Sequence, residues 1–443
     1  MLNFHWSRSS VACVTIVALC LAGCGKPPVK SESPASTESD SKTLAKPEAK
    51  SRATADANDV KAARARIDAL ATRSKYAPKD GDLLTEIVIL DGSNLKAEDL
   101  TLFGKLSDLE KLQIFNCRTL NDEMATHLSG LKNLKSLAMT NSVINDSTVE
   151  MIAKSFPNLT DLDLSSNTNM TNGALKIISE LGKLQRLTLV QNKFNDIGTR
   201  RLSSLKELRS LDLRGNMEAG DMSLEVVSNL PKLNGLKHRS TAVTDSGLEY
   251  LSHNQTLDSL LIQDFAITDQ SGPHLAKLRQ LSQLEIFRCQ GFGSDGVLEL
   301  KGMGLTRLTL RDLPNVDDRA MEVFDNLPQL KRLYLHELTS VGDAGLKHLS
   351  ALTSLELLDI WTVPQMTDAT VDVIATLTNL KELSIRSTEV TDNCIDKLLG
   401  MPNLKTLTFK DNGQITAAGL EKLATKKWSK LDVGSTEKSD ASE

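Results

Sequence analysis

The sequence of 443 residues lacks a surplus of basic residues. Its 52 Lys and Arg stand against 57 Asp and Glu, giving a formal net charge of −5. General nucleic-acid binding, which depends on Lys and Arg neutralising phosphates, is therefore not expected, although local basic patches can exist. Aromatic residues make up only 4% of the chain, so the core must be built mainly from aliphatic side chains.

The sequence also lacks a recognisable catalytic or metal-binding constellation. Its 7 histidines are scattered without metal-ligand spacing, and its glycines do not form a phosphate-binding loop pattern. No residue stands out as an activated nucleophile. We therefore expect a protein that is not an enzyme and that uses neither a metal nor a cofactor.

The N-terminus has no apolar run long enough to span a bilayer, which takes about 20 residues in a helix. A short run from Val11 to Leu19 follows Arg8 and leads at once into the sequence LAGC, which ends at Cys24. This motif resembles the lipobox of bacterial lipoproteins, in which the cysteine thiol receives a lipid and cleavage exposes its amine. The alternatives are an ordinary secretory signal and a membrane-spanning helix.

The lipobox resemblance implies a signal peptide over residues 1–23, lipidation of Cys24 and attachment to the bacterial cell envelope. Gly25 stands where an aspartate often causes retention at the inner membrane, so the resemblance favours the outer membrane. Residues 24–58 are rich in Pro, Ser, Ala, Lys and Glu, a composition that predicts a disordered tether. Residues 435–443 are expected to form a disordered tail.

The feature that dominates the chain is a leucine that returns every 24 or 25 residues. Most units read LxxLxL, a variable stretch, Thr-Asp-x-Gly-Leu or a close variant, and then LxxL. The units start at Leu84, Leu109, Leu134, Leu159, Leu184, Leu208, Leu233, Leu257, Leu281, Leu305, Leu330, Leu355, Leu380, Leu404 and Trp428. Such a period indicates a solenoid, in which each repeat buries its apolar side against its neighbours.

These units resemble the leucine-rich repeat family over residues 84–434. The alternation in LxxLxL predicts a short strand whose positions 0, 3 and 5 point inward and whose positions 2, 4 and 6 face the concave surface. Apolar residues at three- and four-residue spacing after the Thr-Asp predict a helix on the convex side. The expected fold is thus an α/β class curved solenoid with parallel strands inside and helices outside.

A separate helical segment precedes the first repeat. Asp59 opens a run to Tyr76 in which apolar residues recur at helical spacing. A solenoid needs its open end covered, so residues 59–83 are expected to form an N-terminal helical cap.

An aspartate recurs where each helix is expected to begin. The column holds Asp122, Asp146, Asp196, Asp221, Asp245, Asp269, Asp295, Asp318, Asp343, Asp368 and Asp392. Calcium binding and acid–base chemistry are alternatives, but a part that recurs in this way indicates capping of free N–H groups at each helix start.

Two further columns contain unusual residues. The position eight residues after a repeat start holds a cysteine in two repeats, Cys117 and Cys289. In other repeats this position holds asparagine, as at Asn216, or threonine, as at Thr241. Cys394 lies in a different column, at a position that holds a small residue in other repeats. We expect these three to be buried free thiols.

His238 is the only polar residue at inward position five. One interpretation is a neutral core histidine whose hydrogen bonds are satisfied, and another is a local slip in the repeat register. The third is a group whose protonation loosens the fold.

The concave columns of repeats nine to thirteen combine aromatic residues with arginines, the types enriched at binding hot spots. The candidate binding residues are Phe287, Arg307, Arg311, Arg332, Tyr334, His336, Asp359, Trp361 and Arg386. Solvated cross-strand pairing is the alternative for the charged members. Exposed Phe and Trp on one column favour a contact surface.

The sequence predicts a lipid-anchored extracytoplasmic scaffold that binds a protein or peptide of unknown identity through its concave face. A cell-wall or glycan-binding module and a self-associating envelope protein are the alternatives, and the sequence leaves the oligomeric state open. The repeats also resemble those of F-box ubiquitin adaptors, but no F-box precedes them and the lipobox implies a location outside the cytoplasm.

Overall fold

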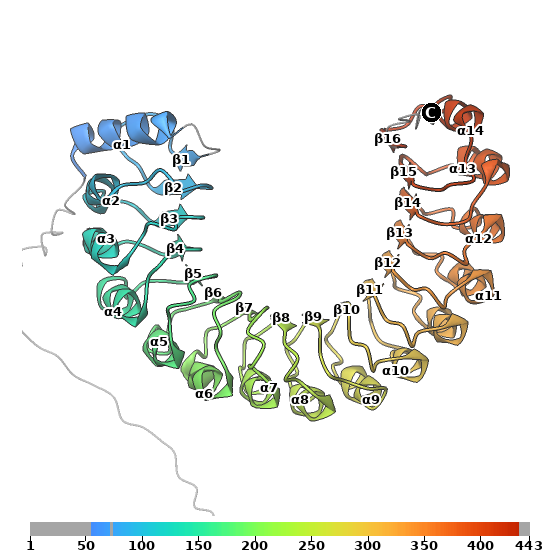
Figure 1. Ribbon diagram of the computed structural model, residues 1–443, viewed down its shortest axis with the longest axis horizontal. Helices are drawn as coiled ribbons and strands as arrows, with labels where there is room; N and C mark the ends of the chain where they lie inside the picture. The colour runs from blue at the N-terminus through green and yellow to red at the C-terminus, as the bar shows by residue number, and fades with distance from the viewer. Residues whose placement is uncertain (1–54, 71–73, 434–443) are drawn as a thin grey trace, which may run out of the picture. The chain divides into compact units, whose positions relative to one another are not determined.

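The structure, a computed structural model, describes residues 55–70 and 74–433. The predicted signal peptide, Cys24, the tether as far as residue 54, and the predicted tail lie outside the described residues. Within the described part, strands line the inner side of an arc of repeats and helices line its outer side (Figure 1). The predicted class, an α/β leucine-rich repeat solenoid, is confirmed.

The strands form one sheet in chain order. They are β1 Lys75–Ala77, β2 Glu86–Ile89, β3 Lys111–Ile114, β4 Ser136–Met139, β5 Asp161–Asp163, β6 Arg186–Thr188, β7 Ser210–Asp212, β8 Gly235–Arg239, β9 Ser259–Gln263, β10 Gln283–Phe287, β11 Arg307–Arg311, β12 Arg332–His336, β13 Leu357–Trp361, β14 Glu382–Arg386, β15 Thr406–Lys410 and β16 Lys430–Asp432. Strand β1 pairs antiparallel with β2, and the pairs from β2 to β16 are parallel.

The convex side carries short α-helices and 3-10 helices. The α-helices are α1 Ala57–Ala69, α2 Ala97–Gly104, α3 Asp122–Thr126, α4 Asp146–Ser155, α5 Asn172–Ile178, α6 Asp196–Thr199, α7 Asp221–Ser228, α8 Asp245–Leu251, α9 Ser271–Ala276, α10 Ser294–Leu298, α11 Asp343–Leu346, α12 Asp368–Ile374, α13 Ile395–Gly400 and α14 Ala417–Leu423. The 3-10 helices are η1 His127–Gly130, η2 Arg200–Ser204, η3 Asp318–Asn326, η4 Lys347–Ala351 and η5 Asp392–Cys394. Alternating inward positions of the strands and one face of each helix close over a continuous aliphatic core.

The N-terminal cap differs from the predicted single helix. Helix α1 begins at Ala57, two residues before the expected Asp59, because Asp56 accepts a hydrogen bond from the N–H of Asn58. It ends at Ala69, and Tyr76 lies in strand β1, where it is paired with Ile87. The predicted tether boundary at residue 58 and the helix to Tyr76 are therefore wrong. An added antiparallel strand supplies hydrogen-bond partners to the free backbone groups at the edge of β2, and a helix cannot supply them.

The aspartate column does cap helices, but ten of its eleven carboxylates serve the helix of the next repeat. Asp196 Oδ1 accepts hydrogen bonds from the N–H groups of Gly220 at 2.8 Å and Ser223 at 3.0 Å. The same contact with the next repeat recurs at Asp122, Asp146, Asp221, Asp245, Asp269, Asp318, Asp343, Asp368 and Asp392. The expectation that each aspartate caps the start of its own helix is wrong in this respect. Asp295 differs from the column, since it is exposed and pairs with Arg319.

A buried asparagine ladder ties neighbouring repeats together below the strands. Asn216 donates to the carbonyls of Leu189 and Leu213, at 2.6 Å and 2.9 Å, and accepts from the N–H groups of Phe194 and Asn192. Every hydrogen-bonding position of this fully buried amide is thus used. The two predicted column members Cys117 and Cys289 are buried free thiols, as is Cys394.

The seventh repeat departs from the regular turn. Thr241, which was expected in the buried column, is exposed. Ser240 is buried instead, and its hydroxyl donates to the carbonyl of Met217 at 2.8 Å. His238 lies in the core of the same repeat, with Nε2 3.0 Å from the carbonyl of Ala219 and its ring edge-on to Phe265. His238 is therefore a core histidine with one backbone contact, but its Nδ1 is buried without a hydrogen-bond partner among the described residues. The predicted register slip is not found at His238, which pairs with Ile262 in the regular strand register. Only the turn at Ser240 and Thr241 departs from the repeat pattern.

Burial of His238 makes the stability of the fold depend on pH. Removal of the ring from water lowers the pKa of His238 from 6.5 to about 4. The unfolded chain therefore binds a proton between pH 6.5 and 4 that the folded chain does not bind, so stability is full above pH 6.5, falls as the pH drops, and levels off below pH 4.

We expect the wild-type protein to lose about 2 kcal/mol of stability relative to His238→Leu between pH 8 and pH 5. Urea unfolding of the two proteins across this range measures the difference. His127→Leu, at an exposed position, is the matched control. A constant difference between wild type and His238→Leu at all pH values contradicts the prediction.

Candidate functional site

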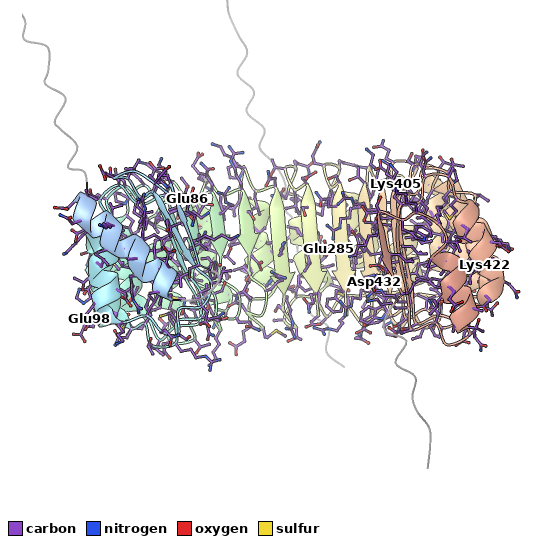
Figure 2. The ribbon with its side chains drawn as sticks, turned by 90° about the horizontal axis from the view of Figure 1, so that it is seen from above. Glu86, Glu98, Glu285, Lys405, Lys422 and Asp432 are labelled. Carbon is purple, nitrogen blue, oxygen red and sulfur yellow. The ribbon has the colours of Figure 1, made fainter. Side chains whose placement is uncertain are left out.

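The predicted binding residues lie on five adjacent strands of the concave face. We call this set the concave patch, and it consists of Phe287 on β10, Arg307 and Arg311 on β11, Arg332, Tyr334 and His336 on β12, Asp359 and Trp361 on β13, and Arg386 on β14. The register aligns Phe287 with Arg311, His336, Trp361 and Arg386 in one row across the sheet. Figure 2 labels Glu285, which lies on β10, the first of these strands. The structure thus brings all nine residues onto one surface.

Guanidinium groups stack on the aromatic rings of this row. The guanidinium carbon of Arg311 lies 4.4 Å from the ring centre of Phe287 and 5.1 Å from that of Trp361. Arg386, on the opposite side of β13, lies 5.2 Å from the ring centre of Trp361. His336 contacts the Trp361 ring edge-on, at 5.7 Å between ring centres. These cation–π and edge contacts fix the side chains before any ligand binds.

A second row lies beside the first. Arg307 stacks on Tyr334 at 4.9 Å, and its guanidinium pairs with Glu285 at 3.2 Å. Arg332 stands next to Arg307 in the register and is exposed. The hydroxyl of Thr309 and Nε of Arg307 are buried without a hydrogen-bond partner among the described residues. These two buried polar atoms are therefore unsatisfied within the described residues.

Acidic residues balance the arginines of the patch. Asp359 pairs with Arg386 at 3.0 Å, and Nε2 of His336 lies 3.4 Å from its carboxylate. Burial acts to raise the pKa of Asp359, but its interactions with His336, Ser384 and Arg386 outweigh burial and hold this pKa below the ordinary value. Arg311 pairs with Glu337 at 3.3 Å. The carboxylate of Asp359 is thus charged at neutral pH and orients two side chains of the patch.

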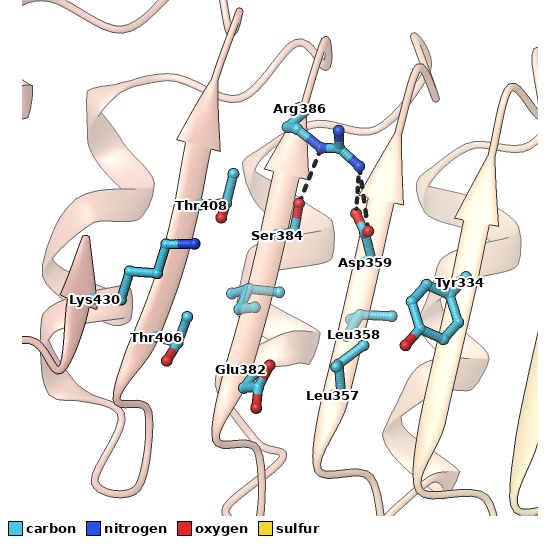
Figure 3. A pocket seen from close by; sticks show the side chains of 11 residues that line it. Tyr334, Leu357, Leu358, Asp359, Glu382, Ser384, Arg386, Thr406, Thr408 and Lys430 are labelled. Carbon is cyan, nitrogen blue, oxygen red and sulfur yellow. Dashed lines mark hydrogen bonds and ion pairs between the residues drawn. The ribbon is translucent and has the colours of Figure 1, made fainter. Parts of the chain in front are cut away.

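A hollow of about 330 Å³ adjoins the patch over the C-terminal strands. Small side chains of Ser384, Thr406 and Thr408 leave this space open. Figure 3 shows Tyr334, Leu357 and Asp359 on one side of it and Lys430 on the other, with Arg386 bonded to Ser384 and Asp359. The sequence prediction missed Thr406, Thr408 and Lys430, although they continue columns two and four into the last two repeats.

The concave face nearer the N-terminus has a different character. Arg186 pairs with Asp161, Arg214 pairs with Asp212 at 2.7 Å, and Arg239 pairs with Asp264 at 2.5 Å. This part of the concave face therefore carries paired charges of both signs.

Within residues 55–70 and 74–433, no three His, Cys, Asp or Glu side chains gather closely enough to hold a metal ion. In the same ranges, no helix has the length and apolar composition needed to cross a bilayer.

Parallel strands on one face, helices on the other and stacked asparagine and aspartate contacts define this protein as a leucine-rich repeat solenoid. Neither a scan against models of known protein families nor a search of curated proteins gives a match. Among solved structures, the chain is similar to an internalin from Listeria monocytogenes, with a TM-score of 0.52 and 21% identity over 85% of this chain and 95% of that one.

A second solved structure with the same fold is the yeast complex of Rad7 and Elc1. It matches with a TM-score of 0.51 and 18% identity, covering 85% of this chain and 87% of the other. At these identities, both likenesses establish the leucine-rich repeat fold and nothing finer.

Proposed function

We propose that the protein is a recognition scaffold that binds a protein or peptide through the concave patch. The observation that carries this proposal is the row of stacked aromatic and guanidinium side chains from Phe287 to Arg386. Such residues supply most of the binding free energy at protein interfaces. Their fixed arrangement lowers the entropy that binding must overcome.

The stacking favours a peptide over a glycan. A sugar ring would need an open aromatic face, whereas Arg311 and Arg386 approach Trp361 from strands on opposite sides of β13. The same guanidinium groups keep N–H donors that suit carbonyl and carboxylate groups of a polypeptide. The yeast structure with the same fold is a complex of two proteins, Rad7 and Elc1, which is the class of partner proposed here.

A peptide-display selection tests the proposed function. Sequences are selected on the immobilised wild-type protein after depletion on the variant in which Arg311, Tyr334 and Trp361 are all alanine. The control variant Arg186→Ala/Arg214→Ala/Lys237→Ala carries the same number of changes on the other part of the concave face. Enriched peptides that bind the control and not the patch variant support the proposal. Selection of glycans alone, in a parallel glycan array, favours the alternative ligand class.

We also propose that the scaffold acts outside the cytoplasm, attached to a bacterial membrane through lipid on Cys24. The lipobox resemblance of LAGC is the support for this placement. A protein held in this way would present the concave patch to partners in the cell envelope. This role is one of binding and not of catalysis.

Replacement of Cys24 by alanine will remove the lipid and release the protein from membranes, because no other thiol occupies the lipobox position. Metabolic labelling with an alkyne fatty acid and membrane fractionation measure the two effects. Cys20→Ala, four residues earlier, is the control and should keep both lipid and membrane association. Undiminished labelling of Cys24→Ala shows that the anchor assignment is incorrect.

A further inference from the structure

The C-terminal end of the described solenoid leaves its core only partly covered. Trp428, Leu431 and Val433 occupy repeat positions zero, three and five, which are buried in the preceding repeats, but here they are only partly buried. Ile415 and Leu420 beside them are also partly buried. Apolar side chains that every inner repeat buries are therefore partly exposed at this end, where the Lys426 ammonium lies 4.7 Å from the centre of the Trp428 ring.

The N-terminal end is covered, which makes the contrast clear. Helix α1 buries Val60, Ala63 and Ile67 over the first repeat, and β1 pairs with the edge of β2. At the other end, β16 is the last strand of the sheet and has no neighbour on its outer side among the described residues (Figure 1).

The outer edge of β16 is complementary to itself. The strand reads Lys430-Leu431-Asp432. If two such strands pair antiparallel about Leu431, Lys430 lies opposite the partner subunit's Asp432, and the converse pair forms two residues away. Asp432 already pairs with Lys410 of its own chain at 2.6 Å, so its carboxylate would be shared between two ammonium groups. Lys430 and Asp432 share the concave side of the sheet, while Leu431 points to the core side, so the same pairing brings the two partly covered cores together.

We propose that two copies of this chain associate through their β16 edges, antiparallel about Leu431. The sheet then continues from one copy into the other, and a twofold axis relates the two C-terminal ends. Burial of Trp428, Leu431 and Val433 against the same residues of the second copy supplies the apolar contact. The edge strand, otherwise open to non-specific pairing, gains a defined neighbour.

A cysteine at the twofold axis tests the pairing in the full chain. In the proposed register the two residues at position 431 face each other with Cα atoms about 4.5 to 5.5 Å apart, within the range that a disulfide spans. Leu431→Cys should give a covalent dimer on a non-reducing gel after mild oxidation. Ser429→Cys is the control, because its counterparts lie about 13 Å apart or more in that register and cannot bridge.

Wild-type protein measures the background from the native thiols, of which Cys117, Cys289 and Cys394 are buried. Folding of each variant is checked by circular dichroism. A monomeric Leu431→Cys protein that is folded overturns the proposal, as does crosslinking of Ser429→Cys to the same extent.

Sedimentation of the chain without new cysteines gives an independent measurement. The wild-type protein should dimerise, and Lys430→Asp should weaken association by about 10-fold, because it places two like charges opposite each other at both ends of the strand pair. A wild-type protein that stays monomeric at high concentration, or equal dimerisation by Lys430→Asp, contradicts the proposal.

Discussion

The variant Arg311→Ala/Tyr334→Ala/Trp361→Ala will bind a selected peptide ligand at least about 100-fold more weakly than the wild-type protein. Trp361 holds Arg311 and Arg386 by stacking, and Tyr334 holds Arg307. The three substitutions therefore remove the central rings and release the remaining guanidinium groups. Isothermal titration calorimetry with the selected peptide measures the loss.

The fold should survive these changes, because the three side chains lie on the concave face and not in the leucine columns. Unchanged circular dichroism and thermal unfolding check this point. Arg311→Lys keeps the charge but removes the planar group that stacks on Phe287 and Trp361, so it separates stacking from simple attraction. Binding by the triple variant at wild-type strength would exclude the concave patch as the ligand site.

Asn216→Ala will destabilise the protein by about 4 kcal/mol, because each buried polar group left without a partner costs roughly 1 to 3 kcal/mol. The amide serves two carbonyls and two N–H groups, which come from its own repeat and from the preceding repeat. Alanine has no atom that replaces any of these contacts. Urea unfolding measures the change in free energy and in the slope, which reports loss of cooperativity between repeats.

The control for this prediction is Asn169→Ala. Asn169 is exposed and makes one hydrogen bond, of 3.3 Å, to the carbonyl of Val143. We expect its loss to change stability by no more than about 0.5 kcal/mol. Equal effects of the two substitutions would mean that the asparagine ladder does not stabilise the solenoid.

The solenoid was predictable because the pattern of buried residues repeats at a fixed period along the sequence. Each leucine column must face the same neighbours in every turn, so a period of 24 or 25 residues gives both the strand register and the side on which the helices lie. The alignment of Phe287, Arg311 and Trp361 in one row followed from that register, and the structure confirms the alignment. Their role in binding stays a prediction.

Other features depend on contacts between repeats that no single unit encodes. The aspartates were expected to cap the starts of their own helices. The distance to the next repeat instead decides which N–H groups the Asp196 carboxylate reaches. Strand β1 was missed because Lys75–Ala77 carries no repeat motif and pairs only through backbone groups at a free edge. The hollow beside Tyr334 also required the structure, since it arises where small residues of adjacent strands meet.

The sequence by itself determined the class of fold, the faces of the repeat and the columns on which a ligand would be sought. The reason is that only a solenoid buries the same positions in every repeat. Only the tertiary structure decided that guanidinium groups cover Trp361, that His238 is buried with a pKa of about 4, and that the C-terminal core stays partly exposed. These properties depend on side-chain packing between repeats, and a pattern read along one repeat does not contain those distances.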